Sequence, residues 1–339
     1  MGCAVVFGGA GFIGSFLSVQ LVKSGLYEKI YIYDVEPIAR KPFPFRKAML
    51  GCHPSIVEVT GDLRSPILWT PPEPVDLIAN FAAIHREPGH ETQEYFETNL
   101  KGAENVCAWA ERVNCCKLIF TSSISPYGVS ESIKDESTLP VPVTAYGASK
   151  LVAEKIHLQW QTARPTERRL VIVRPGVVFG PGEGGNVTRL VKGVLRGYFC
   201  YVGNKGTRKA GIYVKELCNA MLWVLQKQET SGENVSLFNG SMNPGPSIEE
   251  YVLAVCRIAG IRRYVPNIPY SALLSTAYLI DALAKPFGIE HPFSPVRIRK
   301  LVRSNNILPN YLLAQGYPFK YSLEGAMDDW RKSCPAEWQ

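Results

Sequence analysis

Apolar residues follow two alternating periodicities along the first 180 residues. Short apolar runs predict buried parallel strands at residues 3–7, 30–33, 55–60, 76–81, 117–122 and 170–173. Helical spacing of apolar positions predicts helices at residues 12–23, 92–112 and 146–160. Strands that alternate with helices in this way are typical of a doubly wound parallel sheet, so we expect an α/β fold.

The pattern loosens after residue 180, where Gly, Pro and Asn interrupt short predicted helices. We therefore divide the chain into a sheet domain at residues 1–180 and a smaller region at 181–339, some segments of which return to the sheet. Residues 272–289 predict an apolar helix that contains Asp281 and Lys285 and is broken by Pro286. This stretch is unsuited to crossing a membrane. We interpret it as a helix buried in the C-terminal region, rather than one at a subunit or membrane surface.

A glycine-rich turn joins the first strand to the first helix. Glycine allows the sharp turn, the close approach of a pyrophosphate and tight packing of helix on strand, and the helix N-terminus favours phosphate. Asp34 ends the second strand, 20 residues after Gly14, where an acid binds ribose hydroxyls and repels a 2′-phosphate. Arg40 and Lys41 come late for a 2′-phosphate clamp. The pattern predicts NAD as cofactor, held by Gly8, Gly11, Phe12, Ile13, Gly14 and Asp34.

Tyr146 and Lys150 lie one turn apart on a predicted helix. A free tyrosine has a pKa of about 10 and is a poor base at neutral pH. A lysine on the same helix face favours the phenolate, so Tyr146 is a candidate general base and Lys150 the residue that tunes it. The pair predicts proton transfer beside a nicotinamide, at a carbon that carries a hydroxyl or a ketone.

The composition is that of a globular protein. The 339 residues are 46% hydrophobic and 20% charged, and the net charge of +7 suits anionic ligands. No basic run points to nucleic acid. The nine cysteines show no zinc-ligand spacing, and their odd number without a signal peptide predicts reduced thiols, a cytoplasmic protein and no metal.

Motifs along residues 1–250 resemble, as an ordered set, those of extended short-chain dehydrogenases/reductases. Besides the glycine turn and Asp34, the matching segments are 61–63 (GDL), 80–83 (NFAA), 99–102 (NLKG), 120–128 (FTSSISPYG), 146–150 (YGASK), 174–182 (RPGVVFGPG) and 238–240 (FNG). The chain is similar to the NAD-dependent nucleotide-sugar epimerase/dehydratase group. The resemblance implies a Rossmann-like fold and a homodimer. It also implies a bound sugar nucleotide, for which a UDP-linked sugar is the first expectation.

The resemblance also implies roles for single residues. Ser123 matches the catalytic serine or threonine that completes the proton path to Tyr146, with Ser122 and Ser125 as competitors for that role. Lys150 is also implied to bind the nicotinamide ribose. Asp62 and the backbone of Leu63 are expected at the adenine. Further cofactor contacts are expected from Phe81, Ala82, Ala83, Asn99, Ser122, Tyr146 and Pro175.

Substrate contacts are expected on both sides of residue 180. Asn186 and the pair Arg208 and Lys209 resemble positions that bind the diphosphate of a sugar nucleotide, a task that suits guanidinium. His85, Ser123 and Ser125 are the other substrate candidates. A second phosphate-binding arginine is expected among Arg297, Arg299 and Arg303, with no basis for a choice.

These features predict an NAD-dependent sugar-nucleotide 4-epimerase that works through a transient 4-keto sugar, with hexose or acetamidohexose left open. Ile124 stands where family dehydratases carry an acid after the catalytic serine, which argues against dehydration. Val177 also departs from the asparagine of many epimerases. The alternatives are a 4-keto reductase of a deoxysugar nucleotide, a 3β-hydroxysteroid-type dehydrogenase and, outside enzymes, an NAD(H)-sensing protein.

Overall fold

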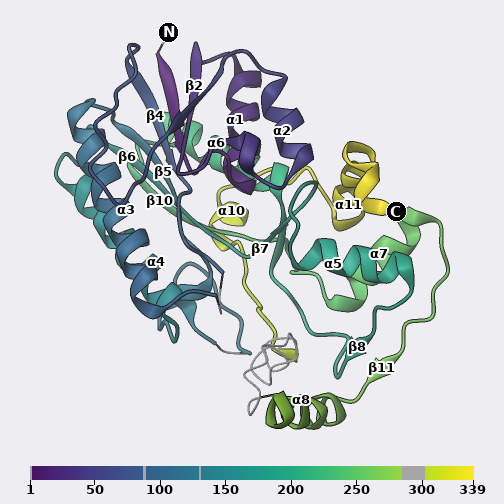
Figure 1. The fold of residues 1–339 in the computed structure, drawn as a ribbon. Helices are drawn as coiled ribbons and strands as arrows, with labels where there is room; N and C mark the ends of the chain where they lie inside the picture. Colours follow the sequence, from purple (N-terminus) through teal and green to yellow (C-terminus); the bar gives the residue numbers. More distant parts are fainter. Residues whose placement is uncertain (1, 87–88, 130, 285–301) are drawn as a thin grey trace.

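A seven-stranded parallel sheet forms the centre of the computed structural model, which describes residues 2–86, 89–129, 131–284 and 302–339 (Figure 1). The strands lie in the order β10-β6-β5-β4-β1-β2-β3. Their bounds are β1 Cys3–Phe7, β2 Lys29–Asp34, β3 Ile56–Thr60, β4 Val75–Asn80, β5 Lys117–Thr121, β6 Arg169–Pro175 and β10 Val235–Gly240. The predicted doubly wound α/β fold is confirmed, with strand ends shifted by one or two residues.

Both faces of the sheet are buried, which explains the continuous apolar runs. In β1, Ala4 and Val6 pack on one face, whereas Cys3, Val5 and Phe7 pack on the other. Alternate side chains of a strand point to opposite faces, so a strand covered on both sides needs apolar residues throughout.

Two helical layers cover the sheet (Figure 1). The helices α3 Thr92–Arg112 and α4 Ala145–Thr162 pack against each other and on the face that holds Val5 and Phe7. The helices α1 Phe12–Ser24 and α6 Val214–Ser231 lie on the opposite face, and α2 Pro44–Gly51 packs against α1. The sequence prediction included neither α2 nor α6.

The chain after residue 181 contributes to both parts of the molecule. α6 and β10 belong to the sheet region. The division of the chain at residue 180 stays a prediction. The remaining elements are β7 Val177–Phe179, α5 Asn186–Arg196, β8 Tyr201–Val202, β9 Gly211–Tyr213, α7 Ile248–Ala259, β11 Asn267–Ile268, α8 Tyr270–Ala284, α10 Asn310–Ala314 and α11 Leu323–Ser333. Short 3-10 helices, among them η2 Ser125–Tyr127, join the elements.

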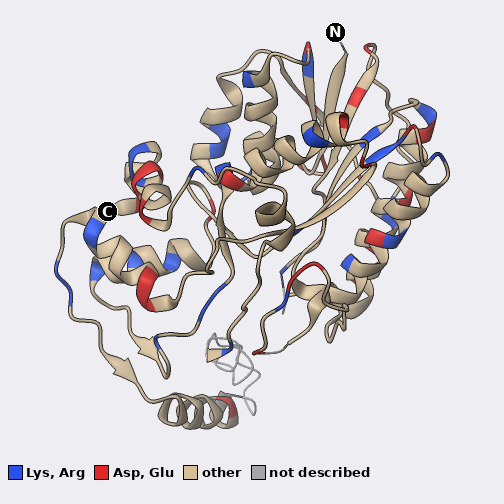
Figure 2. Ribbon diagram, turned by 180° about the vertical axis from the view of Figure 1, so that it is seen from behind, with Lys and Arg blue, Asp and Glu red and all other residues tan. Residues whose placement is uncertain are grey.

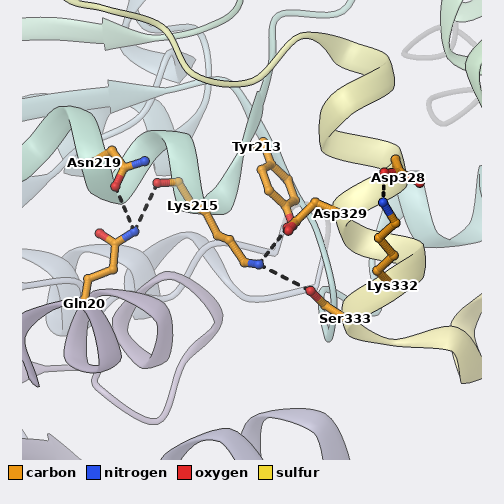
Figure 3. Close-up of polar contacts among 8 residues, drawn as sticks. All are labelled: Gln20, Tyr213, Lys215, Asn219, Asp328, Asp329, Lys332 and Ser333. Carbon is orange, nitrogen blue, oxygen red and sulfur yellow. Dashed lines mark hydrogen bonds and ion pairs between the residues drawn. The ribbon is translucent and has the colours of Figure 1, made fainter. Parts of the chain in front are cut away.

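The C-terminal helix α11 is tied back to the sheet region by polar contacts (Figure 3). Asp329 accepts hydrogen bonds from the hydroxyl of Tyr213 and from Lys215 Nζ, the latter at 2.6 Å. The backbone carbonyl of Lys215 in turn accepts a bond from Gln20 of α1 at 3.2 Å. These contacts connect α11, the start of α6 and α1.

The apolar helix predicted at residues 272–289 begins earlier, at Tyr270, and its described part ends at Ala284. Our prediction that it is buried is wrong, because Leu279 and Leu283 are 61% and 63% exposed. The neighbouring elements leave several apolar side chains of this helix exposed to solvent. Among the described residues, no helix is both long enough and apolar enough to cross a membrane.

A buried ion pair fixes α4 on the sheet. Arg174 of β6 donates two hydrogen bonds to Glu154 of α4, at 2.8 and 2.6 Å, and Ser122 donates a third at 2.5 Å. Both charged side chains are at most 5% exposed. Burial opposes the charge of Arg174, but the hydrogen bonds and charge of Glu154 outweigh it and raise the arginine pKa.

We expect Arg174→Met to lower the free energy of unfolding by about 3–5 kcal/mol, because it leaves the carboxylate of Glu154 buried without its cation. The double variant Glu154→Leu with Arg174→Met is expected to recover most of this loss. Urea unfolding followed by circular dichroism measures both.

The exposed pair Lys101–Glu104 provides the control, since Lys101→Met should change the free energy of unfolding by less than about 1 kcal/mol. A double variant as unstable as Arg174→Met alone would show that the uncompensated charge is not the cause.

Candidate active site

The glycine turn between β1 and α1 forms a tight backbone cradle. Gly8 has φ of +74°, and a Cβ there would lie 2.7 Å from the backbone nitrogen of Ala82. A Cβ at Gly14 would lie 2.5 Å from the carbonyl oxygen of Gly8. Side chains at these positions would collide with the neighbouring backbone, so the tight turn requires glycine. A glycine turn at the start of a helix suits the diphosphate of NAD. Gly11, Phe12 and Ile13, at the start of α1, lie where the sequence predicted them.

Two acids meet beside this cradle at the ends of β2 and β3. Asp34 ends β2, and its carbonyl accepts a bond from Gly61 at 3.0 Å. The neighbouring Asp62 is held by a bidentate ion pair with Arg64, which lowers the pKa of its carboxyl. Leu63 is buried, and its carbonyl accepts a bond from Asn105 at 2.6 Å. The arrangement suits adenosine, with Asp34 at the ribose and Asp62 at the base.

Lys41 reaches Asp34 from the loop after β2. Its Nζ lies 3.2 Å from Asp34 Oδ1 and 3.4 Å from Glu36 Oε2. Lys41 thus reaches the acid at the end of β2, because the loop folds back on the strand. That Lys41 comes late for a 2′-phosphate clamp stays a prediction. The acid stays in place, so the site still favours ribose hydroxyls over a 2′-phosphate.

The loop after β4 lies along the cradle and is braced from α3. Phe81, Ala82 and Ala83 are partly exposed, and the backbone nitrogen of Phe81 donates to Phe7 at 2.9 Å. Asn99 bonds both backbone groups of Ile84, at 2.9 and 3.2 Å, and donates to Ser149 of α4 at 2.9 Å. The asparagine thus joins α3, this loop and the helix that carries Tyr146.

Tyr146 and Lys150 lie on the first two turns of α4. Thr144 caps the helix by accepting a bond from Gly147 at 3.1 Å. A Cβ at Gly147 would lie 2.8 Å from the carbonyl oxygen of Ser125, so the glycine lets the start of α4 pack tightly on η2. Tyr146 is therefore held next to the segment that follows β5.

The three serines after β5 have different partners. Ser122 is engaged by Glu154, as described above. Ser123 is 8% exposed, and its hydroxyl accepts a bond from the backbone nitrogen of Ser125 and contacts the Ser125 hydroxyl, each at 3.1 Å. The hydroxyls of Ser123 and Ser125 therefore form one pair, whereas that of Ser122 donates to Glu154 of α4. Pro175, at the end of β6, is buried nearby.

Lys150 is 3% exposed and lies 4.7 Å from the ring centre of Phe120. Burial lowers its pKa to about 7, against the opposing charge of Glu154. His157 stacks on the same Phe120 ring at 4.0 Å and, with its pKa lowered to about 4 by burial, stays neutral. Lys150 thus lies in apolar surroundings, where its cation would interact strongly with a nearby negative charge.

His85 follows the braced loop. Desolvation by neighbouring atoms, together with the positive charges of Arg86 and Lys150, lowers the pKa of its imidazole, and the residue as a whole is exposed. This places His85 within electrostatic reach of Lys150 and keeps it a candidate for contact with substrate.

The expected diphosphate-binding residues lie on the C-terminal region. Arg208 donates to the carbonyl of Gly245 at 2.6 Å, and Lys209 donates to the carbonyl of Arg303. Burial lowers the pKa of Lys209 to about 8. Asn186 begins α5, is exposed and accepts a bond from Arg189. Of the three other arginines considered, Arg303 is exposed, and Arg297 and Arg299 lie outside the described residues.

Arg46 was not predicted, although it borders the cradle. Its guanidinium is 4% exposed, lies 3.5 Å from the ring centre of Phe43 and donates to the carbonyl of Ala10 at 3.3 Å. Burial lowers its pKa to about 10. The only available signal was an arginine in a short amphipathic helix, which is ordinary on a protein surface.

Comparisons with known proteins agree with this geometry. The model of the NAD dependent epimerase/dehydratase family matches residues 4–237. The N-acetyl-alpha-D-glucosaminyl-diphospho-ditrans,octacis-undecaprenol 4-epimerase of Escherichia coli is 27% identical, over 96% of this chain and 92% of that protein. The 3-beta-hydroxysteroid dehydrogenase of Mycolicibacterium neoaurum is 25% identical, over 90% and 83%.

Solved structures share the fold along the whole chain. The UDP-N-acetylglucosamine 4-epimerase of Methanobrevibacter ruminantium, in complex with UDP-N-acetylmuramic acid, superposes with a TM-score of 0.76 at 19% identity and covers 99% of each chain.

We expect Asp34→Ala to weaken NAD⁺ binding by roughly 10- to 100-fold, because hydrogen bonds to a charged group contribute about 1.5–3 kcal/mol. The preference for NAD⁺ over NADP⁺ should shrink as well, since the variant keeps Lys41 and loses the repelling acid. Calorimetric titration of cofactor-free protein with each nucleotide measures both effects. Glu36→Ala, which removes the other partner of Lys41, is the control and should leave NAD⁺ affinity nearly unchanged; an unchanged affinity in Asp34→Ala would place the ribose elsewhere.

A second prediction concerns the buried lysine. An unfolded chain gives Lys150 a pKa near 10.4, against about 7 in the fold. The destabilisation from burying its cation is therefore fully present below pH 7 and disappears as the pH rises to about 10. Lys150→Met removes it, so relative to wild type the variant should be most stable near pH 6 and lose this advantage between pH 7 and 10, by at most about 1.4 kcal/mol per unit.

Urea unfolding of both proteins from pH 6 to pH 10 tests this dependence. Lys155→Met, at an exposed position of the same helix, should show no such trend. A constant difference between Lys150→Met and wild type across the range would contradict the lowered pKa.

Proposed function

Because this chain belongs to the NAD-dependent epimerase/dehydratase family, we propose that it inverts C4 of a sugar linked through a diphosphate. The observation that supports the proposal is the tight packing of Gly147, which follows Tyr146 in α4, on the backbone of Ser125, whose hydroxyl contacts that of Ser123. This packing lies at the same edge of the sheet as the glycine cradle. Ligands of such sheets bind beyond the carboxyl ends of the strands.

The residues of this site supply proton transfer at the sugar. Tyr146 takes the proton of the C4 hydroxyl, with Ser123 hydrogen-bonded to that hydroxyl. The phenolate formed on proton loss from Tyr146 would stabilise the cation of Lys150, so the two residues titrate as a pair. The cradle, Asp34 and Asp62 are the residues that would hold NAD, which would supply reversible hydride transfer at C4.

The residue after Ser123 favours epimerisation over dehydration. Ile124 packs against Tyr127, Ala210 and Ile307, so it extends an apolar cluster. Elimination of water needs an acid or base near the sugar, and an isoleucine supplies neither.

Cations on the C-terminal region support a diphosphate in the substrate. Arg208 and Lys209 are partly buried, and Arg303 is exposed next to them. Guanidinium and ammonium groups are suited to phosphate oxygens. The carrier beyond the diphosphate is uridine in our first form of the proposal, with hexose or N-acetylhexosamine as the sugar.

A second form of the proposal replaces the nucleotide by a lipid. The undecaprenol-linked epimerase of Escherichia coli matches nearly the whole of this chain, including the region after residue 237 that the family model leaves out. The exposed apolar residues of α8 in that region favour the lipid-linked form. Proton transfer at C4 is the same for both carriers.

We also propose that the enzyme is a cytoplasmic homodimer. Partly exposed Phe96 and Leu100 line a hollow on the outer face of α3, between charged residues, which suits contact with a second copy. Thiols at all nine cysteines suit a reducing compartment.

We expect Tyr146→Phe to lower the rate of epimerisation by about 10²–10⁴-fold, the usual contribution of a general acid–base group. NMR of protein incubated with UDP-GlcNAc, UDP-glucose or a short-chain prenyl-diphospho-GlcNAc, without added NAD, detects the C4 epimer.

Tyr95→Phe is the matched control, because its ring centre lies 6.1 Å from that of Tyr146 and it should keep the rate within a few-fold. Absence of an epimer with all three substrates, even with NAD⁺ supplied, would sink the 4-epimerase. Consumption of NADH with a 4-keto-6-deoxy sugar nucleotide would then indicate the 4-keto reductase.

A further inference from the structure

The helix α8 (Tyr270–Ala284) carries an exposed apolar face. It contains no lysine or arginine and a single acid, Asp281. Leu279 and Leu283 lie one turn apart, so they share a face, and both are more than 60% exposed. Figure 1 shows α8 away from the seven-stranded sheet, beyond β8 and β11. In Figure 2 the ribbon of this helix has a red segment and no blue one.

The start of α8 is joined to the proposed diphosphate site. A Cβ at Gly203 would lie 3.3 Å from Tyr270 Cβ and 3.6 Å from Val302 Cγ1. The backbone that follows Val302 runs beside residues 207–210, with Asn305 donating to the carbonyl of Arg208 at 2.9 Å. The apolar helix therefore begins next to the segments that carry Arg208, Lys209 and Arg303.

We propose that α8 rests on the surface of a phospholipid bilayer, with Leu279 and Leu283 among the acyl chains, and that it brings the active site to a polyprenyl-diphosphate sugar. This inference rests on the lipid-linked form of the proposed function. A diphosphate sugar on a polyprenyl chain places its polar end at the headgroup layer. An enzyme for it needs cations for the diphosphate and, next to them, an apolar surface that meets the membrane.

The length of α8 fits this role. The 15 described residues of α8 rise about 22 Å, less than the roughly 30 Å of a bilayer core, so this part of the helix suits the interface plane rather than a span. The size of its face also disfavours a second copy as the occupant. That face measures roughly 22 by 10 Å, about 220 Å², whereas a stable dimer buries roughly 800 Å² on each partner.

Flotation of the full-length protein with vesicles of phosphatidylethanolamine and phosphatidylglycerol tests the surface directly. Wild type should float with the vesicles. The double variant Leu279→Ser with Leu283→Ser should bind at least about tenfold more weakly, because two leucines no longer leave water. Leu253→Ser is the matched control, since Leu253 is 52% exposed on α7, and it should float like wild type. Circular dichroism and retained NAD verify folding of each variant.

Turnover separates this inference from the function on which it rests. The double variant should lose most of its activity on long-chain polyprenyl-diphospho-GlcNAc held in vesicles and keep its activity on the water-soluble short-chain analogue. If wild type turns over neither substrate, the lipid-linked function fails, while flotation still decides whether α8 binds the bilayer.

Two results would overturn the proposal for α8. The first is wild-type protein that stays in solution, or a double variant that floats as wild type does. The second is a double variant that changes from dimer to monomer in sedimentation velocity with unchanged flotation, which would make α8 a contact between copies.

Discussion

The geometry of the site depends on the burial of Glu154 between Arg174 and Ser122. These three residues come from α4, β6 and the end of β5, so a single carboxylate fixes a helix against two neighbouring strands. A buried ion pair adds little net stability, because desolvation offsets its attraction. Its value here is geometric, since each shift of α4 along the sheet would break hydrogen bonds to a charge that has no access to water.

The same burial gives Lys150 its chemical character. Lys150 lies one turn before Glu154, on the side of α4 that faces Phe120 and the neutral His157. In these apolar surroundings the cation interacts strongly with any negative charge that forms on Tyr146. The Glu154–Arg174 ion pair holds α4 on the sheet, and Asn99 of α3 holds it through Ser149. Gly147 packs tightly on the backbone of Ser125, so the start of α4 lies against the segment that follows β5. The position of α4 and the burial of Lys150 therefore have one cause, the close packing of α4 on the edge of the sheet.

The sequence predicted those parts of the molecule in which the pattern of apolar residues and glycines directly reflects burial and backbone packing. The central strand β1 is apolar throughout because both of its faces are covered, and the glycine turn is required by backbone contacts such as that of Gly8 with Ala82. The approach of Lys41 to Asp34 and of Arg46 to Ala10 could not be read in this way, because loops and short helices bring these residues in from outside the periodic pattern. The role of Ser122 was also beyond reach, since only the fold shows that Glu154 points to it.

Our prediction that the helix at residues 272–289 is buried was wrong for a physical reason, and this reason is relevant to the choice of substrate. An apolar helix is normally explained by burial, and the sequence carries no separate mark for apolar residues that meet a membrane. The described part of α8 leaves Leu279 and Leu283 in contact with solvent, which disfavours the helix as a core element. A site that must hold a diphosphate between cations and also reach a carrier in a bilayer needs both kinds of surface side by side. In this chain the two are joined through Gly203, Tyr270 and Val302, which supports our proposal that the apolar helix takes part in substrate recognition.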